Sequence, residues 1–211
     1  MSSQKQSPKA LIFLGNPGGE YEKTRHNAGF LFANQAFPGQ SWEKKFHGLH
    51  GQAQFQRQDS SPWKLWLLKP ETYMNQSGKS ARAFQQFYKL EAEELLVVFD
   101  QLELPCGSWR FRQNGGLAGH KGLRSLVEQG LEPQFHRLEL GIGRPEKGSV
   151  SSHVLGRFQP WEEALFEKAL KEAAQALGFT GVVNAYVLAQ DLPGDQALEQ
   201  GVQHFLYGVF S

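Results

Sequence analysis

Apolar residues fall along this chain in two kinds of pattern, short runs typical of strands and longer repeats typical of helices. Five short apolar or alternating runs have the length of strands: 10–14, 63–69, 95–100, 109–113 and 135–143. Four longer stretches repeat their apolar residues every three or four positions and are expected to be helices: 26–36, 75–88, about 120–129 and 161–177. Strands that alternate with helices favour an α/β fold, which we expect to contain one mixed, mostly parallel, twisted sheet with helices on both faces.

The stretch 161–177 has the clearest amphipathic pattern. Its expected buried stripe is Trp161, Leu165, Ala169, Ala173 and Ala176, and Gly178 is a suitable helix stop. The Pro/Gly stretch 190–194 is expected to be a loop before a last helix, not a linker. We therefore expect the chain to divide into a disordered N-terminal extension, 1–9, and a single domain, 10–211.

Composition excludes several classes of protein. The 211 residues are 40% hydrophobic and 20% charged, which is typical of a globular chain with a real core. The longest apolar runs are too short to span a bilayer, and the polar N-terminus has no signal-peptide core. Cys106 is the only cysteine, so no internal disulfide forms and a reducing compartment such as the cytoplasm fits. The net charge of +1 excludes a basic coat but not a local basic patch.

Polar residues gather where predicted strands end, and α/β sheets bind ligands at such ends. Four places share this feature: the turn around Asn16, the segment 69–78, Asp100 directly after an apolar run, and the glycine-rich segment that leads to His120. Each also has a purely structural interpretation. Asn16-Pro-Gly is ordinary turn chemistry, Asn75 is a suitable helix N-cap, and Asp100 could cap a turn.

Several familiar chemistries do not match the chain. The glycines at 15–19 have neither dinucleotide-binding nor Walker spacing, and no Gly-x-Ser-x-Gly elbow occurs. None of the seven histidines forms a His-Glu-x-x-His pair, so we expect no metal. Cys106 follows Pro105 in a turn without a nucleophile signature, which makes a peptidase using His26 and Cys106 a weak alternative.

What remains is a base without a protein nucleophile. His26 is able to take up a proton near neutral pH, and Asp100 could hold its other ring nitrogen. The amides of Asn16 and Asn75 both donate and accept hydrogen bonds, so they could fix a carbonyl or a water. This set suits direct attack of water on an acyl bond.

Five ordered blocks resemble the bacterial peptidyl-tRNA hydrolase family. They are Leu14-Gly-Asn-Pro-Gly-x-x-Tyr21-x-x-Thr-Arg-His26-Asn-x-Gly29, Lys69-Pro-x-Thr-Tyr73-Met-Asn75-x-Ser-Gly78, Asp100-x-Leu-x-Leu-Pro105, Gly119-His120-x-Gly-Leu-Arg-Ser125, and Phe135-x-Arg137-Leu-x-Leu-Gly-Ile-Gly-Arg-Pro145. The blocks span roughly residues 10 to 177, and the long first block within this ordered set makes the resemblance specific.

The resemblance implies a monomeric enzyme, without metal or cofactor, that cleaves the ester joining a peptide to the terminal ribose of a tRNA. His26 then matches the catalytic base, Asp100 the carboxylate that orients it, and Asn16 the residue that distinguishes peptidyl-tRNA from free aminoacyl-tRNA. The positions implied to bind substrate or tRNA are Tyr21, Tyr73, Asn75, His120, Lys121, Arg112 and Arg137.

Two positions depart from the family pattern. Lys121 stands where the family usually has Asn; an ammonium only donates, but it is able to grip a phosphate. One half of the family's clamp for the tRNA 5′ phosphate falls on Arg112 and the other on Glu139, which would repel phosphate unless Arg110 or Arg137 compensates. These departures leave open a second hypothesis, a catalytically silent RNA-binding relative of the organellar splicing-factor type.

Basic residues of the second half of the chain are consistent with tRNA binding, although a solvated surface would look the same. They are Arg110, Arg112, Lys121, Arg124, Arg137 and Arg144. If these residues cluster, they would bind backbone phosphates without reading sequence.

Overall fold

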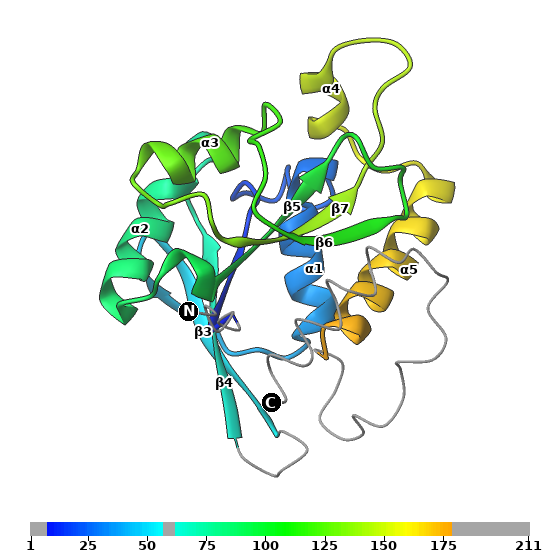
Figure 1. Cartoon of the computed structure of the whole chain (residues 1–211). Coiled ribbons are helices and arrows are strands. Elements are labelled where there is room, and N and C mark those ends of the chain that lie inside the picture. Colours follow the sequence, from blue (N-terminus) through cyan, green and yellow to red (C-terminus); the bar gives the residue numbers. More distant parts are fainter. Residues whose placement is uncertain (1–7, 57–61, 179–211) are drawn as a thin grey trace.

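A seven-stranded sheet in the order β2-β3-β4-β1-β5-β7-β6 forms the centre of the computed structural model, which describes residues 8–56 and 62–178 (Figure 1). The strands are β1 Ala10–Phe13, β2 Glu43–Lys45, β3 Gly48–Gln56, β4 Pro62–Pro70, β5 Leu95–Gln101, β6 Trp109–Gln113 and β7 His136–Gly141. The helices are α1 Ala28–Ala36, α2 Ser77–Tyr88, α3 Lys121–Glu128, α4 Val150–Leu155 and α5 Pro160–Ala176. Single 3-10 turns lie at Arg25–Asn27, Met74–Gln76 and Ala92–Glu94.

The expectation of a mixed sheet is confirmed, but the antiparallel share is larger than we expected. The four central strands β4, β1, β5 and β7 are parallel to their neighbours in this row. The outer pairs β2–β3, β3–β4 and β6–β7 are antiparallel, so "mostly parallel" describes only the centre. The physical reason is that β2 and β3, which the apolar pattern does not predict, form a hairpin on β4; glycines and glutamines leave β3 few large apolar residues to indicate a strand.

Helices cover both faces of the sheet, as the sequence predicts (Figure 1). On one face, α1 and α5 pack over inward side chains such as Leu11 and Phe13 of β1. On the other face, α2 and α3 pack over the alternate residues Ala10 and Ile12. Neighbouring residues of a strand point to opposite faces, so a strand apolar at every position, like β1, lies between two helical layers.

The expected buried stripe of α5 is wrong at its start. Trp161 is 65% exposed and Leu165 is 45% exposed, whereas Phe166 and Leu170 are buried with Ala173. A step of four residues overshoots a helical turn by roughly 40°, so a stripe drawn in such steps winds around the helix. The stripe is therefore correct at its C-terminal end and lies outside the core at its N-terminal end.

Two glycines bring helix starts unusually close to their neighbours. A Cβ at Gly29 would lie 2.5 Å from the Leu14 carbonyl oxygen and 2.6 Å from that of Val98. A Cβ at Gly78 would lie 2.0 Å from the Ser125 carbonyl oxygen. Without side chains there, the start of α1 lies against the end of β1 and against β5, and the start of α2 lies against α3.

The boundary expected for the N-terminal extension needs a correction. Lys9, which we placed in that extension, joins the sheet: its N–H donates to the Glu94 carbonyl at 2.7 Å, and its carbonyl accepts from Trp66 N–H at 3.0 Å. The expected loop at 190–194 and the residues before Pro8 lie outside the described residues. Within the described ranges, no helix is long and apolar enough to cross a membrane.

Candidate active site

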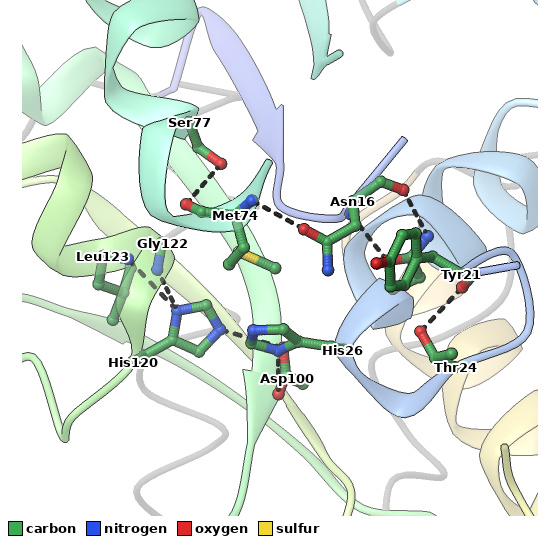
Figure 2. Close-up of polar contacts among 11 residues, drawn as sticks. Asn16, Tyr21, Thr24, His26, Met74, Ser77, Asp100, His120, Gly122 and Leu123 are labelled. Atoms are coloured by element: carbon green, nitrogen blue, oxygen red, sulfur yellow. Dashed lines mark hydrogen bonds and ion pairs between the residues drawn. The ribbon is translucent and has the colours of Figure 1, made fainter. Parts of the chain in front are cut away.

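Polar side chains from three separate segments meet at the carboxyl end of the central strands (Figure 2). Asp100 is near the end of β5, Asn16 lies just beyond β1, and His26 lies in the 3-10 turn that precedes α1. All three are nearly buried, with 3%, 6% and 8% of their surface exposed. The sequence prediction that these residues share one site is therefore consistent with their placement.

Asp100 lies between two imidazoles. His26 Nδ1 is 2.9 Å from Asp100 Oδ1 and 3.0 Å from Oδ2. His120 Nε2 is 3.0 Å from the same Oδ1. His120 was expected to bind substrate; its side chain is 7% exposed, and its ring contacts the same carboxylate as His26.

The partners of each ring assign its tautomer. His120 is the N-cap of α3, and its Nδ1 accepts from the N–H groups of Gly122 and Leu123 at 3.1 and 3.3 Å. The Nδ1 lone pair is thus occupied, so Nε2 carries the proton that is donated to Asp100. His26 in turn donates its Nδ1 proton to Asp100, which leaves the lone pair of its Nε2 available as a base.

The carboxyl of Asp100 is held in its ionised form. Burial by itself would raise its pKa, but the electrostatic attraction and hydrogen bonds of the His26 and His120 rings outweigh burial and hold the pKa of Asp100 well below its usual range. An ionised carboxylate at this position stabilises a positive charge on the neighbouring ring.

Asn16 is fixed on three sides. Its backbone N–H donates to Asn27 Oδ1 at 2.8 Å, and Asn27 Nδ2 donates to the Asn16 carbonyl at 3.0 Å. Its side-chain Oδ1 accepts from the Met74 N–H at 2.8 Å. Because the oxygen is engaged by Met74, the amide nitrogen of Asn16 is directed to the side on which His26 lies (Figure 2).

The expected substrate-binding residues around this centre are accessible. Tyr73 is 57% exposed, and its ring meets that of Tyr21 edge to face, with centroids 6.5 Å apart. Asn75 is exposed in the turn between Met74 and α2, and Lys121 is exposed at the first position of α3. None of the four is enclosed in the core, so each is available to a ligand.

The arginines expected to bind tRNA differ in how far their side chains are exposed. Glu139, fully buried on β7, accepts from Arg110 Nη2 at 2.6 Å and pairs with Arg112 Nε at 2.8 Å. Both arginine side chains remain about 40% exposed, at 40% and 37%. Glu139 therefore anchors two outward-facing cations instead of repelling phosphate. Arg137 is 0% exposed, so its placement does not support the contact with tRNA that we expected of it.

The donor chemistry at the centre does not favour a cation. One potential ligand atom from each of His26, Asp100 and His120 lies within 4.8 Å of the others. However, His120 Nε2 carries a proton because its Nδ1 accepts backbone N–H groups, and a protonated nitrogen does not coordinate a metal. His26 Nδ1 is likewise engaged with Asp100.

Sequence reasoning missed the residues that hold the site together. Asn27 and the backbone of Met74 fix Asn16, although we assigned neither a role. Arg25, next to His26, is 6% exposed and donates to Glu162 Oε2 at 2.5 Å, which ties the turn to the start of α5. Both Arg25 and Asn27 lie in the first block, but nothing in one sequence indicates which distant atoms they contact.

Comparison with known proteins agrees with this arrangement. The sequence profile of the family described as peptidyl-tRNA hydrolase matches residues 10–190. The peptidyl-tRNA hydrolase of Treponema pallidum is 46% identical over 162 residues, covering 75% of this chain and 79% of that protein. The enzyme of the same name from Halalkalibacterium halodurans is 40% identical over 172 residues, covering 80% and 90%.

A solved structure extends the similarity to the fold. The crystal structure of peptidyl-tRNA hydrolase from Acinetobacter baumannii superposes with a TM-score of 0.77 at 34% identity. The superposition covers 97% of this chain and 95% of that one. The similarity therefore extends over nearly the whole length of both chains.

Proposed function

Because this chain belongs to the peptidyl-tRNA hydrolase family, we propose that His26 is the base with which it hydrolyses the ester between peptide and tRNA. The hydrolytic activity follows from membership of the family, and the comparisons give no support to a silent RNA-binding relative. The observation that carries the assignment to His26 is its 2.9 Å contact with Asp100, which leaves Nε2 free to accept a proton.

In this proposal, water is the nucleophile. His26 Nε2 takes a proton from water as the water oxygen bonds to the ester carbonyl carbon. The tetrahedral intermediate then expels the ribose oxygen, which receives the proton from the His26 imidazolium. The products are the peptide carboxylic acid, which loses its proton to the solvent, and a tRNA with a free terminal hydroxyl. Asp100 stays ionised throughout and stabilises the imidazolium.

Asn16 is proposed to bind the peptide side of the ester. Its Oδ1 is occupied by the Met74 N–H, so its Nδ2 is the group available to donate to a substrate carbonyl. An acylated α-amino group brings such a carbonyl next to the ester, and a free aminoacyl-tRNA lacks it. Asn75, Tyr21 and Tyr73 are proposed to contact the rest of the acceptor end, since they are accessible around the same centre.

The tRNA backbone is proposed to meet exposed cations at two places. Lys121 offers an exposed ammonium at the start of α3, where the positive end of the helix dipole also favours an anion. Arg112 offers a guanidinium that Glu139 holds in place, and Arg110 beside it replaces the contribution that we first assigned to Arg137. Contacts of this kind accept many tRNAs because they read charge, not sequence.

We also expect a monomer that acts in the cytoplasm without a metal or cofactor. The single cysteine and the cytoplasmic origin of peptidyl-tRNA support this location. Light scattering of the purified protein and activity in the presence of a chelator test the first and the last of these expectations.

The decisive experiment is His26→Ala, assayed with N-acetylated aminoacyl-tRNA. We expect turnover to fall by about 10²- to 10⁴-fold, the usual loss for a positioned base, with little change in KM. His47→Asn, at an exposed histidine of the β2–β3 turn, is the matched control and should retain activity. A folded His26→Ala protein with near wild-type turnover would show that another group is the base.

A further inference from the structure

A buried guanidinium lies against the loop that connects β6 to α3. Arg137, in β7, is the largest fully buried side chain among the described residues, with 0% of its surface exposed. Its Nη1 donates to the Gly116 carbonyl and its Nη2 to the Gly115 carbonyl, both at 2.6 Å. Its guanidinium lies 4.9 Å from the ring centroid of Phe135.

A cation is an expensive group to bury at this position. Burial and nearby Arg112 lower the pKa of the Arg137 guanidinium, and Glu139 offsets part of this effect. An apolar side chain of similar volume would cover the sheet without that cost. What a guanidinium adds is a rigid fork of two donors, and here the fork matches two consecutive carbonyls.

The loop that receives this fork has a strained backbone. Asn114 and Ala118 have φ values of 64° and 47°, a left-handed conformation that costs about 1 kcal/mol or more for a residue with a Cβ. Gly115 and Gly119 also have positive φ, 136° and 73°. Such a conformation persists when contacts from outside the loop hold it, and Arg137 supplies two of them.

The loop ends at a residue of the active site. His120 N–H donates to the Leu117 carbonyl at 2.8 Å, and the His120 ring donates to Asp100. Contacts therefore run without a break from Arg137 through the loop to His120, Asp100 and His26.

We propose that Arg137 is a positioning residue: it holds the loop at 114–119 so that the His120 ring meets Asp100 and Lys121 stands at the edge of the site. The inference rests on the proposed roles of Asp100 and His26. Arg137 acts through the loop and touches no substrate.

Two variants test the proposal in the full-length protein. Arg137→Lys keeps the charge but loses the fork, and Arg137→Ala removes both. We expect kcat for N-acetylated aminoacyl-tRNA to fall by about 10- to 100-fold in each, the cost of misplacing a catalytic group by about 1 Å. Arg82→Met is the matched control, because Arg82 is a half-buried arginine of α2 that bonds only its neighbour Gln85 among the described contacts, and its kcat should be unchanged.

Chemical rescue separates positioning from general stability. Guanidinium ion at about 20 mM should restore part of the kcat of Arg137→Ala, and urea, which has the same shape without the charge, should not. Thermolysin cleavage before Leu117 should be faster in both variants than in the wild type, and this readout does not depend on activity.

Each outcome decides the matter. Wild-type kcat in folded Arg137→Lys overturns the proposal, as does equal rescue by urea and guanidinium. Faster cleavage with unchanged kcat also overturns the proposal, because Arg137 would then order the loop without any effect of the loop on catalysis. The proposed role of His26 would stand in that case. If Arg137→Ala fails to fold, the kcat and cleavage of Arg137→Lys decide alone.

Discussion

Replacement of Asp100 by Asn removes one charge from the centre of the site with little change of shape. The carboxylate accepts hydrogen bonds from His26 Nδ1 at 2.9 Å and from His120 Nε2 at 3.0 Å. An amide oxygen in place of Oδ1 would keep both hydrogen bonds, but an amide nitrogen in place of Oδ2 would face the His26 Nδ1 proton, now 3.0 Å from Oδ2. The imidazolium that forms during hydrolysis would lose its counter-charge.

The expected loss follows from Coulomb's law. Two unit charges about 4 Å apart attract by about 4 kcal/mol at an effective dielectric constant of about 20. At about 1.4 kcal/mol for each factor of ten, kcat should fall by about 10³-fold. The assay is single-turnover ester hydrolysis of N-acetylated aminoacyl-tRNA at pH 7, with KM measured separately.

The matched control is Glu94→Gln, at the opposite end of the same strand. Glu94 is 4% exposed and accepts from the Glu91 N–H, so its replacement also removes a buried carboxylate, but far from His26. Its kcat should stay within about threefold of the wild type, the scatter expected for a site with no contact to the reaction. If folded Asp100→Asn kept kcat within the same margin, Asp100 would not stabilise the transition state.

Three further predictions concern charge, pH and packing. Lys121→Gln should raise KM at low salt, leave kcat mostly unchanged, and reduce the slope of log affinity against log salt by a little under one; an unchanged slope in both this variant and Lys121→Asn would exclude a phosphate contact. Burial lowers the pKa of Lys69 to about 8, so the unfolded chain binds more protons than the folded one above that pH, and stability should rise between about pH 8 and 10.5. Urea unfolding should show this rise, about 3 kcal/mol, in the wild type but not in Lys69→Met; parallel curves would contradict it. Gly29→Ala should lower the free energy of unfolding by about 3 kcal/mol, because the new Cβ would meet backbone atoms that do not yield; an unchanged urea midpoint would refute this.

Local patterns in the sequence predicted most of the elements of this protein, with the exception of β2, β3 and α4, and its candidate chemistry. The fully apolar run of β1 predicted a strand buried on both faces, because every position of such a strand meets a helical layer. The residues of the first block, with Asp100 at the end of another apolar run, predicted a base and its carboxylate, because the carboxyl ends of parallel strands meet at one edge of the sheet.

Tertiary structure alone decided which polar side chains around the site are exposed and which are buried and hold other parts of the site in place. Arg112 of β6 lies directly opposite Arg137 of β7 in the sheet, yet the Arg112 side chain is 37% exposed and Arg137 is fully buried. His120 lies beside Lys121 in the chain, but its ring turns inward to Asp100. One sequence encodes the type and spacing of these side chains. Their burial and their partners depend on strands and loops that are distant in the chain, and those contacts form only when the sheet and its helices pack together.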